Sequence, residues 1–328
     1  MKKIAFDLMG NDNGVKPGVE SALLFIQKNP DYKIFLVGNE QEIKQYLTQD
    51  SEQIEIINVE KVVEKNETNI RALARETTSM SVTMDLLLEN KVDAILSSGD
   101  SASYLSLSTL KLKRLENVSR PAFMPMIPTA KDDKFFLLLD SGANLEVKPE
   151  YFEQWGIIAS IFYKHLFKYD NPSVGLINIG TEDYKGFDYH KEANVLLKQN
   201  SKINYKGFIE PRDILKGDIE IALADGYAGN ITLKSLEGTV LTFSRFLKEK
   251  ITSSFFRKIA ALMLKKAFKE VKEKFDYRNV GAAWVIGVNG VVLKAHGSSD
   301  TKAYTGALNQ IKIAVESNVL AEVKEALK

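Results

Sequence analysis

The chain of 328 residues is predicted to fold as an α/β protein, a three-layer α/β/α sandwich with a mostly parallel sheet. Three observations predict this fold. Short apolar runs recur along the chain, and they are continuous rather than alternating, as expected for strands buried on both faces. Glycine and small polar residues follow each run. Stretches with helical periodicity lie between many of the runs, and this alternation favours parallel strands joined by right-handed crossovers.

The expected strands and helices follow one another along the whole chain. The strands are expected at residues 3–8, 33–37, 92–96, 135–139, 174–179, 219–224, 282–288 and 290–294. The helices with the clearest periodicity are expected at residues 19–27, 72–89, 149–165 and 303–318. The sequence contains no internal repeat and no long linker. Residues 1–328 are therefore expected to form one composite domain, with a helical excursion at residues 236–277.

Composition and charge exclude several classes of protein. The chain is 45% hydrophobic and 27% charged, which is typical of globular proteins. It has no cysteine, which excludes disulfides, thiolate metal sites and a cysteine nucleophile. Its net charge of +1 argues against nucleic-acid binding. With no secretory signal and no apolar run near the ~20 residues that span a bilayer, a cytoplasmic protein is expected, bound at most to the inner face of the cell membrane.

No metal and no cofactor are expected. The three histidines, His165, His190 and His296, lie far apart and lack the spacing of metal ligands. Neither a Walker lysine loop nor a dinucleotide-binding glycine motif follows the first strand. Asp7 and Asp12 are candidates for binding a cation, but carboxylates near strand ends more often hold loop amides.

The loops that follow the strands are rich in glycine and neutral donors. In a parallel sheet such loops meet at the carboxyl edge, where ligands bind. Backbone N–H groups near glycine bind small anions such as phosphate, and they stabilise the charge that develops when a thioester is attacked. Any single loop is equally well explained as a tight turn. The residues expected to bind phosphate or an acyl thioester are Asp7, Gly10, Asp12, Asn13, Gly99, Asp100, Ser101, Gly180, Asp225, Gly229, His296, Gly297, Ser298 and Ser299.

Two further residues are catalytic candidates. Lys185 follows a strand end, and a lysine supplies a point charge for phosphate or an oxyanion. Asn230 ends the loop at residues 225–230, and its amide both donates and accepts hydrogen bonds. By residue type alone, a solvated surface lysine and a helix-capping asparagine are the commoner interpretations.

In their order along the chain, these loops resemble the PlsX family, the acyl-carrier-protein:phosphate acyltransferases of bacterial phospholipid synthesis. The resemblance runs almost from end to end. Its most specific segments are residues 287–300, with the sequence GVNGVVLKAHGSSD, and residues 225–230, DGYAGN, followed by KSLEGT at residues 234–239. Further matches lie at residues 140–144, 178–180, 185–186 and 212–217.

The resemblance implies transfer of a fatty acyl group from acyl carrier protein to inorganic phosphate, which gives acyl phosphate for phospholipid synthesis. It also implies a fold like that of isocitrate and isopropylmalate dehydrogenases, a homodimer and peripheral association with a membrane. The catalytic lysine and asparagine of the family match Lys185 and Asn230. Lys185 is therefore expected to hold the phosphate that attacks the thioester, and Asn230 to orient it or to donate to the oxyanion.

The sequence departs from the family pattern at three places. Asn11 replaces a glycine of the opening loop, and Trp284 lies where a proline is usual. Asp100 replaces a neutral amide, and its charge is expected to repel phosphate unless it is neutralised or turned away.

The helical excursion is strongly basic. Residues 245–274 contain ten basic and three acidic residues, a local charge of +7. A basic amphipathic helix with aromatic residues is typical of a membrane-surface element, and it also suits an acidic carrier protein. Packing on a dimer partner is the alternative. The residues expected to contact membrane or carrier are Phe255, Phe256, Arg257, Lys258, Ile259, Leu262, Met263, Lys265 and Lys266.

Two other functions stay open at this point. One is a phosphate acetyl- or butyryltransferase that uses acyl-coenzyme A. The other is a catalytically weak scaffold of lipid synthesis on a membrane, which the departure at Asp100 permits. Turnover with each acyl donor separates them.

Overall fold

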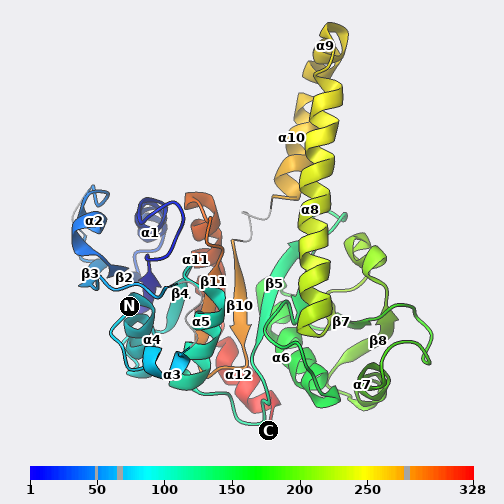
Figure 1. Cartoon of the computed structure of the whole chain (residues 1–328), viewed down its shortest axis with the longest axis horizontal. Coiled ribbons are helices and arrows are strands. Elements are labelled where there is room, and N and C mark those ends of the chain that lie inside the picture. The colour runs from blue at the N-terminus through cyan, green and yellow to red at the C-terminus, as the bar shows by residue number, and fades with distance from the viewer. Residues whose placement is uncertain (49–50, 65–68, 277–280) are drawn as a thin grey trace.

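The computed structural model describes residues 1–48, 51–64, 69–276 and 281–328 of the chain (Figure 1). The strands are β1 (Lys2–Asp7), β2 (Tyr32–Gly38), β3 (Ile54–Asn58), β4 (Ala94–Ser97), β5 (Ala122–Pro128), β6 (Phe135–Leu139), β7 (Ser173–Ile177), β8 (Asn204–Ile209), β9 (Ile221–Leu223), β10 (Ala282–Ile286) and β11 (Val291–Ala295). The helices are α1 (Lys16–Lys28), α2 (Glu40–Lys44), α3 (Ile70–Leu73), α4 (Ser79–Leu88), α5 (Ser101–Leu107), α6 (Pro149–Phe167), α7 (Asp188–Gln199), α8 (Gly226–Ile251), α9 (Phe255–Met263), α10 (Lys265–Lys274), α11 (Thr301–Glu316) and α12 (Val319–Ala326).

The strands form one mixed sheet in the order β3-β2-β1-β4-β11-β10-β5-β6-β9-β7-β8. Two groups of parallel strands make up its ends, β3-β2-β1-β4-β11 and β6-β9-β7-β8. Between them, β10 and β5 are paired antiparallel to their neighbours. The prediction of a mostly parallel sheet is therefore confirmed.

Helices cover both faces of the sheet, and most strands away from its edges, such as β1, bury both of their faces. In β1, Ile4 and Phe6 pack in one core cluster with residues of α1, α6 and α11. Ala5, which points to the opposite face, packs in a second cluster with residues of α4 and α5. This arrangement accounts for the continuous apolar runs and confirms the three-layer sandwich.

One central strand, β5, was not expected from the sequence. Pro125 and Pro128 lie within it, and proline cannot donate a hydrogen bond to a neighbouring strand. The strand changes partners along its length, since residues 122–125 pair with β10 and residues 126–128 pair with β6. It therefore connects the two halves of the sheet.

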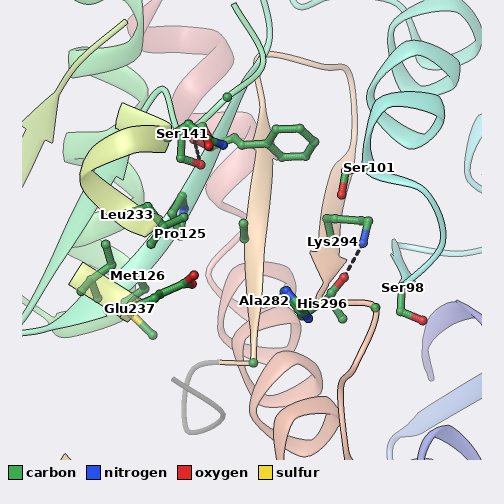
Figure 2. A pocket seen from close by; sticks show the side chains of 18 of the residues that line it. Ser98, Ser101, Pro125, Met126, Ser141, Leu233, Glu237, Ala282, Lys294 and His296 are labelled. Atoms are coloured by element: carbon green, nitrogen blue, oxygen red, sulfur yellow. Dashed lines mark hydrogen bonds between the residues drawn. The ribbon is translucent and has the colours of Figure 1, made fainter. Parts of the chain in front are cut away.

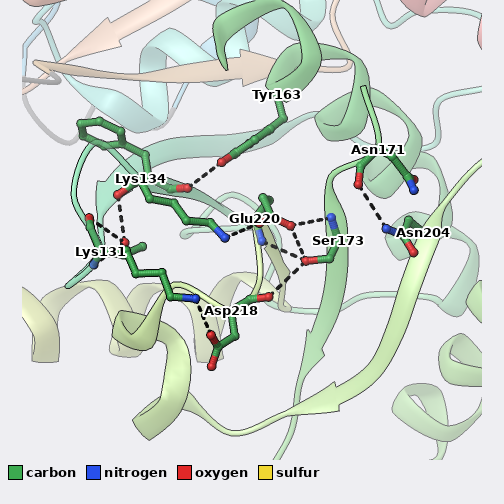
Figure 3. A network of polar contacts seen from close by, with 10 residues as sticks. Lys131, Lys134, Tyr163, Asn171, Ser173, Asn204, Asp218 and Glu220 are labelled. Atoms are coloured by element: carbon green, nitrogen blue, oxygen red, sulfur yellow. Dashed lines mark hydrogen bonds and ion pairs between the residues drawn. The ribbon is translucent and has the colours of Figure 1, made fainter. Parts of the chain in front are cut away.

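A polar network fixes the turn between β5 and β6 against β7 and β9 (Figure 3). Glu220, just before β9, accepts a hydrogen bond from the Ser173 backbone N–H at 2.7 Å and pairs with Lys134. Lys131 pairs with Asp218 at 2.6 Å. These contacts tie the second strand group to the central strands.

The helical excursion projects from the body as a hairpin of α8, α9 and α10 (Figure 1). Its first helix begins at Gly226, ten residues before the expected start, because the Asp225 carboxylate caps it. The first turns of α8 pack on the body, and residues 241–250 are exposed. The expected last residue, Tyr277, lies outside the described residues.

The projecting part of the hairpin exposes large apolar side chains. Phe255 and Phe256 are 72% and 82% exposed, and Leu262 and Met263 are 70% and 85% exposed. Within the described residues, no helix is both long enough and apolar enough to cross a membrane.

Candidate active site

A cleft of about 480 Å³ lies between two parts of the sheet (Figure 2). One wall consists of the loops after β1 and β4 and the end of β11, and the other consists of β5, the loop after β6 and the first half of α8. Of the residues expected to bind substrate or to be catalytic, those that line it are Gly10, Asp12, Gly99, Asp100, Ser101, Asn230, His296 and Gly297. Those that lie outside its lining are Asp7, Asn13, Gly180, Lys185, Asp225, Gly229, Ser298 and Ser299.

Three glycine-rich loops meet at one edge of the sheet because β1, β4 and β11 are neighbours. The Asp12 backbone N–H donates to the Gly297 carbonyl at 2.8 Å, and the Asn13 side-chain amide donates to the Ser298 carbonyl at 3.1 Å. Gly10 has a φ of +77°, and a Cβ on it would lie 3.0 Å from the Gly99 Cα. Only glycine lets these loops approach so closely.

Asp7 is buried below the loops that follow β1 and β4, and its hydrogen bonds fix their position. Its carboxylate accepts hydrogen bonds from the Ser97 hydroxyl at 2.7 Å and the Met9 N–H at 3.1 Å. Burial raises the pKa of Asp7 to about 6, although these hydrogen bonds act in the opposite direction. Asp7 is therefore placed to position the loops and not to contact a ligand.

Asp100 lines the cleft, but its carboxylate is engaged with backbone. The side chain accepts a hydrogen bond from the Ser103 N–H at 2.8 Å and so caps α5. The Asp100 carboxylate is therefore turned toward the start of α5, and the positive charge of Lys294 acts on it from further away.

Asn11 compensates for the glycine that it replaces. Its side-chain amide donates to the Ser299 carbonyl at 3.2 Å and to the Tyr304 hydroxyl at 2.5 Å. The Tyr304 hydroxyl in turn donates to the Ser98 hydroxyl at 2.6 Å. The three loops are thus linked by a side-chain network that the sequence pattern did not reveal.

His296 faces the cleft with its ring fixed by the next turn. The Ser298 N–H donates to Nδ1 at 3.2 Å, and the Ser298 hydroxyl lies 2.8 Å from the same atom. Nδ1 therefore accepts, which assigns the proton of the neutral ring to Nε2. Ser299 is buried beside the loop. Both serines are placed to shape the site.

Asn230 lies on α8 at the edge of the cleft. Its Nδ2 donates to the Ser141 carbonyl at 2.9 Å, which leaves one N–H and the carbonyl oxygen of the amide. Asp225 fixes the helix start, since its carboxylate accepts from the N–H groups of Tyr227 at 3.0 Å and Ala228 at 2.8 Å. The start of α8 therefore sets the position of Asn230.

Gly229 lets α8 approach the loop after β6. A Cβ at this position would lie 1.9 Å from the Asp140 carbonyl oxygen. Gly229→Ala is expected to cost about 1–3 kcal/mol of unfolding free energy through overpacking. Gly238→Ala, in the same helix with no atom within 4 Å of its Cβ, is expected to stabilise by up to about 1 kcal/mol. Urea unfolding of both variants measures the difference, and equal stability of the two would contradict the packing described.

Lys185 lies on the loop between β7 and α7, outside the lining of the cleft. Its Nζ pairs with Glu182 at 2.9 Å, and its side chain is 33% exposed. The Glu182 carboxylate raises the pKa of Lys185. Gly180 packs directly under this lysine, where a Cβ would meet the side chain at 2.4 Å. Asn230 thus lines the cleft, and Lys185 does not.

The wall opposite the glycine loops is mainly apolar, with Glu237 as its charged residue in the described lining, and it was not expected from the sequence. Figure 2 shows Pro125, Met126 and Leu233 on this side, away from Lys294 and His296. Further lining residues on this wall are Ile127, Pro128, Leu215, Leu236, Val240 and Leu241. In the described part of the chain, no group of three or more histidine, aspartate or glutamate side chains is placed to hold a metal ion.

Solved structures show which known fold the chain adopts. The fold matches the EutD phosphotransacetylase from Staphylococcus aureus with a TM-score of 0.61, over 95% of this chain and 93% of that one, at 16% identity. It matches a phosphotransacetylase from Streptococcus pyogenes with the same TM-score, over 96% of this chain and 94% of that one, also at 16% identity. The chain therefore has the phosphotransacetylase fold.

The family follows from sequence. Residues 2–322 match the family described as fatty acid synthesis protein. The phosphate acyltransferase of Mycoplasma mobile is 59% identical over 100% of both chains, and that of Bacillus subtilis is 36% identical over 99% of this chain and 98% of its own. The chain belongs to this family of acyltransferases, which confirms the identification made from the loop motifs.

Proposed function

We propose that this protein transfers a fatty acyl group from acyl carrier protein to inorganic phosphate, producing acyl phosphate and the free thiol of the carrier. The observation that carries the proposal is the two-sided cleft. Glycine loops and Lys294 form a wall suited to an anion, and β5 with α8 forms a wall suited to an acyl chain. A thioester at the boundary between them has phosphate on one side and its hydrocarbon on the other.

The apolar wall favours a long acyl chain over acetyl or butyryl. Each methylene that leaves water contributes about 0.8 kcal/mol, so binding strengthens with chain length as long as the wall continues. Here the wall follows α8 from Leu233 through Val240 to Leu241, toward the exposed part of the hairpin. A two-carbon acyl group would use little of this surface.

The reaction needs no strong general acid. A phosphate oxygen attacks the thioester carbonyl carbon, the carbonyl becomes an oxyanion, and its collapse breaks the carbon–sulfur bond. The thiol has an ordinary pKa of about 8.5, so it leaves as thiolate with little help. The free N–H of the Asn230 amide and the backbone N–H groups of the glycine loops stabilise the charge that develops.

Lys185 is proposed to serve the cleft of a second copy of this chain, in a homodimer. Three apolar side chains near it are highly exposed, with Ile179 at 79%, Tyr184 at 73% and Phe187 at 68%. Such a surface fits a protein partner. A lysine outside its own cleft, on an apolar surface, supports a site that is complete only in the dimer.

The hairpin is proposed to contact the inner face of the cell membrane. Its exposed Phe256 and Met263 would enter the lipid interface, and the basic residues around them, Lys258 among these, would attract anionic lipid. The acyl chain would then approach the cleft along α8. The same charge suits an acidic carrier protein while it delivers the thioester.

The test is an assay of acyl phosphate trapped with hydroxylamine. The purified protein is incubated with phosphate and either a long-chain acyl carrier protein or the matching acyl-coenzyme A. Phosphate-dependent product from the carrier substrate is expected. Product from coenzyme A alone would instead assign the chain to the short-chain transferases, and no product from either would support the scaffold.

A further inference from the structure

Lys294 is a buried lysine on the wall of the cleft. It lies at the carboxyl end of β11, in register with Ser97 of β4, and 6% of its surface is exposed. Figure 2 shows its side chain beside Ser98, in the loop after β4, and Ser101, the first residue of α5. Such a position needs an explanation, because lysine is almost never fully buried unless it is paired.

The Lys294 ammonium is only partly satisfied by the protein. It has three N–H donors, and in the described residues it makes one hydrogen bond, to the Ala295 carbonyl. It forms no ion pair there, although the charges of Asp100 and Asp7 act on it from further away. Two of its donors therefore lack an acceptor among the described residues.

The nearby carboxylates are not built as its partners. Asp100 accepts from the Ser103 N–H and caps α5, and Asp7 accepts from the Ser97 hydroxyl and the Met9 N–H. Each carboxylate thus has hydrogen bonds of its own to other groups. A structural ion pair therefore does not explain why the Lys294 side chain is buried.

We propose that the Lys294 ammonium binds inorganic phosphate in the cleft and holds it for attack on the thioester. This inference rests on the proposed function. The two remaining N–H groups donate to phosphate oxygens, and the Ser101 hydroxyl completes the contact. The negative charge of phosphate offsets the positive charge of the buried ammonium. The attraction between the two charges is stronger inside a cleft than in water.

Lys294 and Lys185 differ in their response to pH. Burial lowers the pKa of Lys294 to about 8, although Asp100 and Asp7 act in the opposite direction. Glu182 raises the pKa of Lys185. As pH rises through about 8, Lys294 loses its charge while Lys185 keeps it, so phosphate affinity is expected to fall in that range. Phosphate itself only gains negative charge as pH rises.

Other titratable side chains near the site do not account for such a fall. They are Asp7, Asp12, Asp100, Glu237, His296, Tyr104 and Tyr304. Burial raises the pKa of Asp7 to about 6 and that of Tyr304 to about 12, and it raises the pKa of Tyr104 as well.

The test is Lys294→Met, with the exposed Lys206→Met as the matched control. Inorganic phosphate is titrated into each protein by calorimetry, and its KM is measured with acyl carrier protein as donor. In Lys294→Met, the Kd and KM for phosphate are expected to rise about 10- to 100-fold, as for loss of charged hydrogen bonds. The KM for the acyl donor and the Tm are expected to stay near those of the control.

Unchanged phosphate affinity in folded Lys294→Met would overturn the inference. If that variant does not fold, the wild-type titration decides, because phosphate affinity that is constant through pH 8 also overturns it. Calorimetry needs no turnover. A wild-type protein that binds phosphate through Lys294 but makes no acyl phosphate would therefore refute the proposed function and leave the inference standing.

Discussion

Asn230→Ala is expected to lower kcat for acyl phosphate formation by about 100- to 1,000-fold, the usual effect of removing one donor to an oxyanion. The residue lines the cleft, and its remaining N–H is the side-chain donor that α8 presents there. Lys185→Ala is expected to have a similar effect, through loss of the charge that screens the attacking phosphate.

The fold of both variants is expected to persist. Asn230 makes one side-chain hydrogen bond to the Ser141 carbonyl, and the Lys185–Glu182 pair is largely solvated, so neither change removes a core contact. Circular dichroism and thermal unfolding check this. Near-normal turnover in either folded variant would rule out the assigned catalytic role of that residue.

Neutralising the hairpin is expected to abolish binding to anionic vesicles. The variant replaces Arg257, Lys258, Lys265, Lys266 and Lys269 with glutamine. Each basic residue near an anionic surface contributes about 1 kcal/mol, so five losses amount to roughly 5 kcal/mol, more than about 1,000-fold in affinity. Co-sedimentation with vesicles that contain anionic lipid measures the effect.

A matched control changes the same charge elsewhere. Five exposed lysines on the body of the protein, Lys28, Lys91, Lys113, Lys206 and Lys324, are replaced with glutamine. This control is expected to retain most of the binding, because these residues lie outside the hairpin. Equal binding by the hairpin variant and the wild type would reject the membrane contact. A hairpin variant that instead changes oligomeric state would show that the hairpin packs on a partner chain.

The sequence predicts the fold well where a strand is apolar on both faces. Ile4, Ala5 and Phe6 are such a run, and their burial against helices on opposite faces is what makes the run continuous. The prediction from sequence fails at β5, because two prolines make this central strand unlike a strand in sequence. It also fails at the start of α8, where the Asp225 cap extends the helix toward the cleft.

For the site, the sequence predicts loops more readily than side chains. The glycine loops after β1, β4 and β11 meet because their strands are neighbours, which strand topology makes expected. The apolar wall and Lys294 were missed, because which side of a buried strand faces a cleft depends on packing. The signal for Lys294 was a lone charge at the end of the apolar run at residues 290–294. Lys185 lies outside the lining of the cleft that Asn230 lines, which the order of the motifs does not reveal.

The central claim is that acyl transfer takes place in the cleft at Asn230, with Lys185 supplied by a second chain. Co-expression of Lys185→Ala and Asn230→Ala chains tests it most directly, with phosphate-dependent acyl phosphate formation as the measurement. Each variant alone is expected to be inactive, because every cleft lacks one residue. A mixed dimer contains one cleft with both, so the co-expressed chains are expected to regain activity. Mixed dimers that form but stay inactive would contradict the claim.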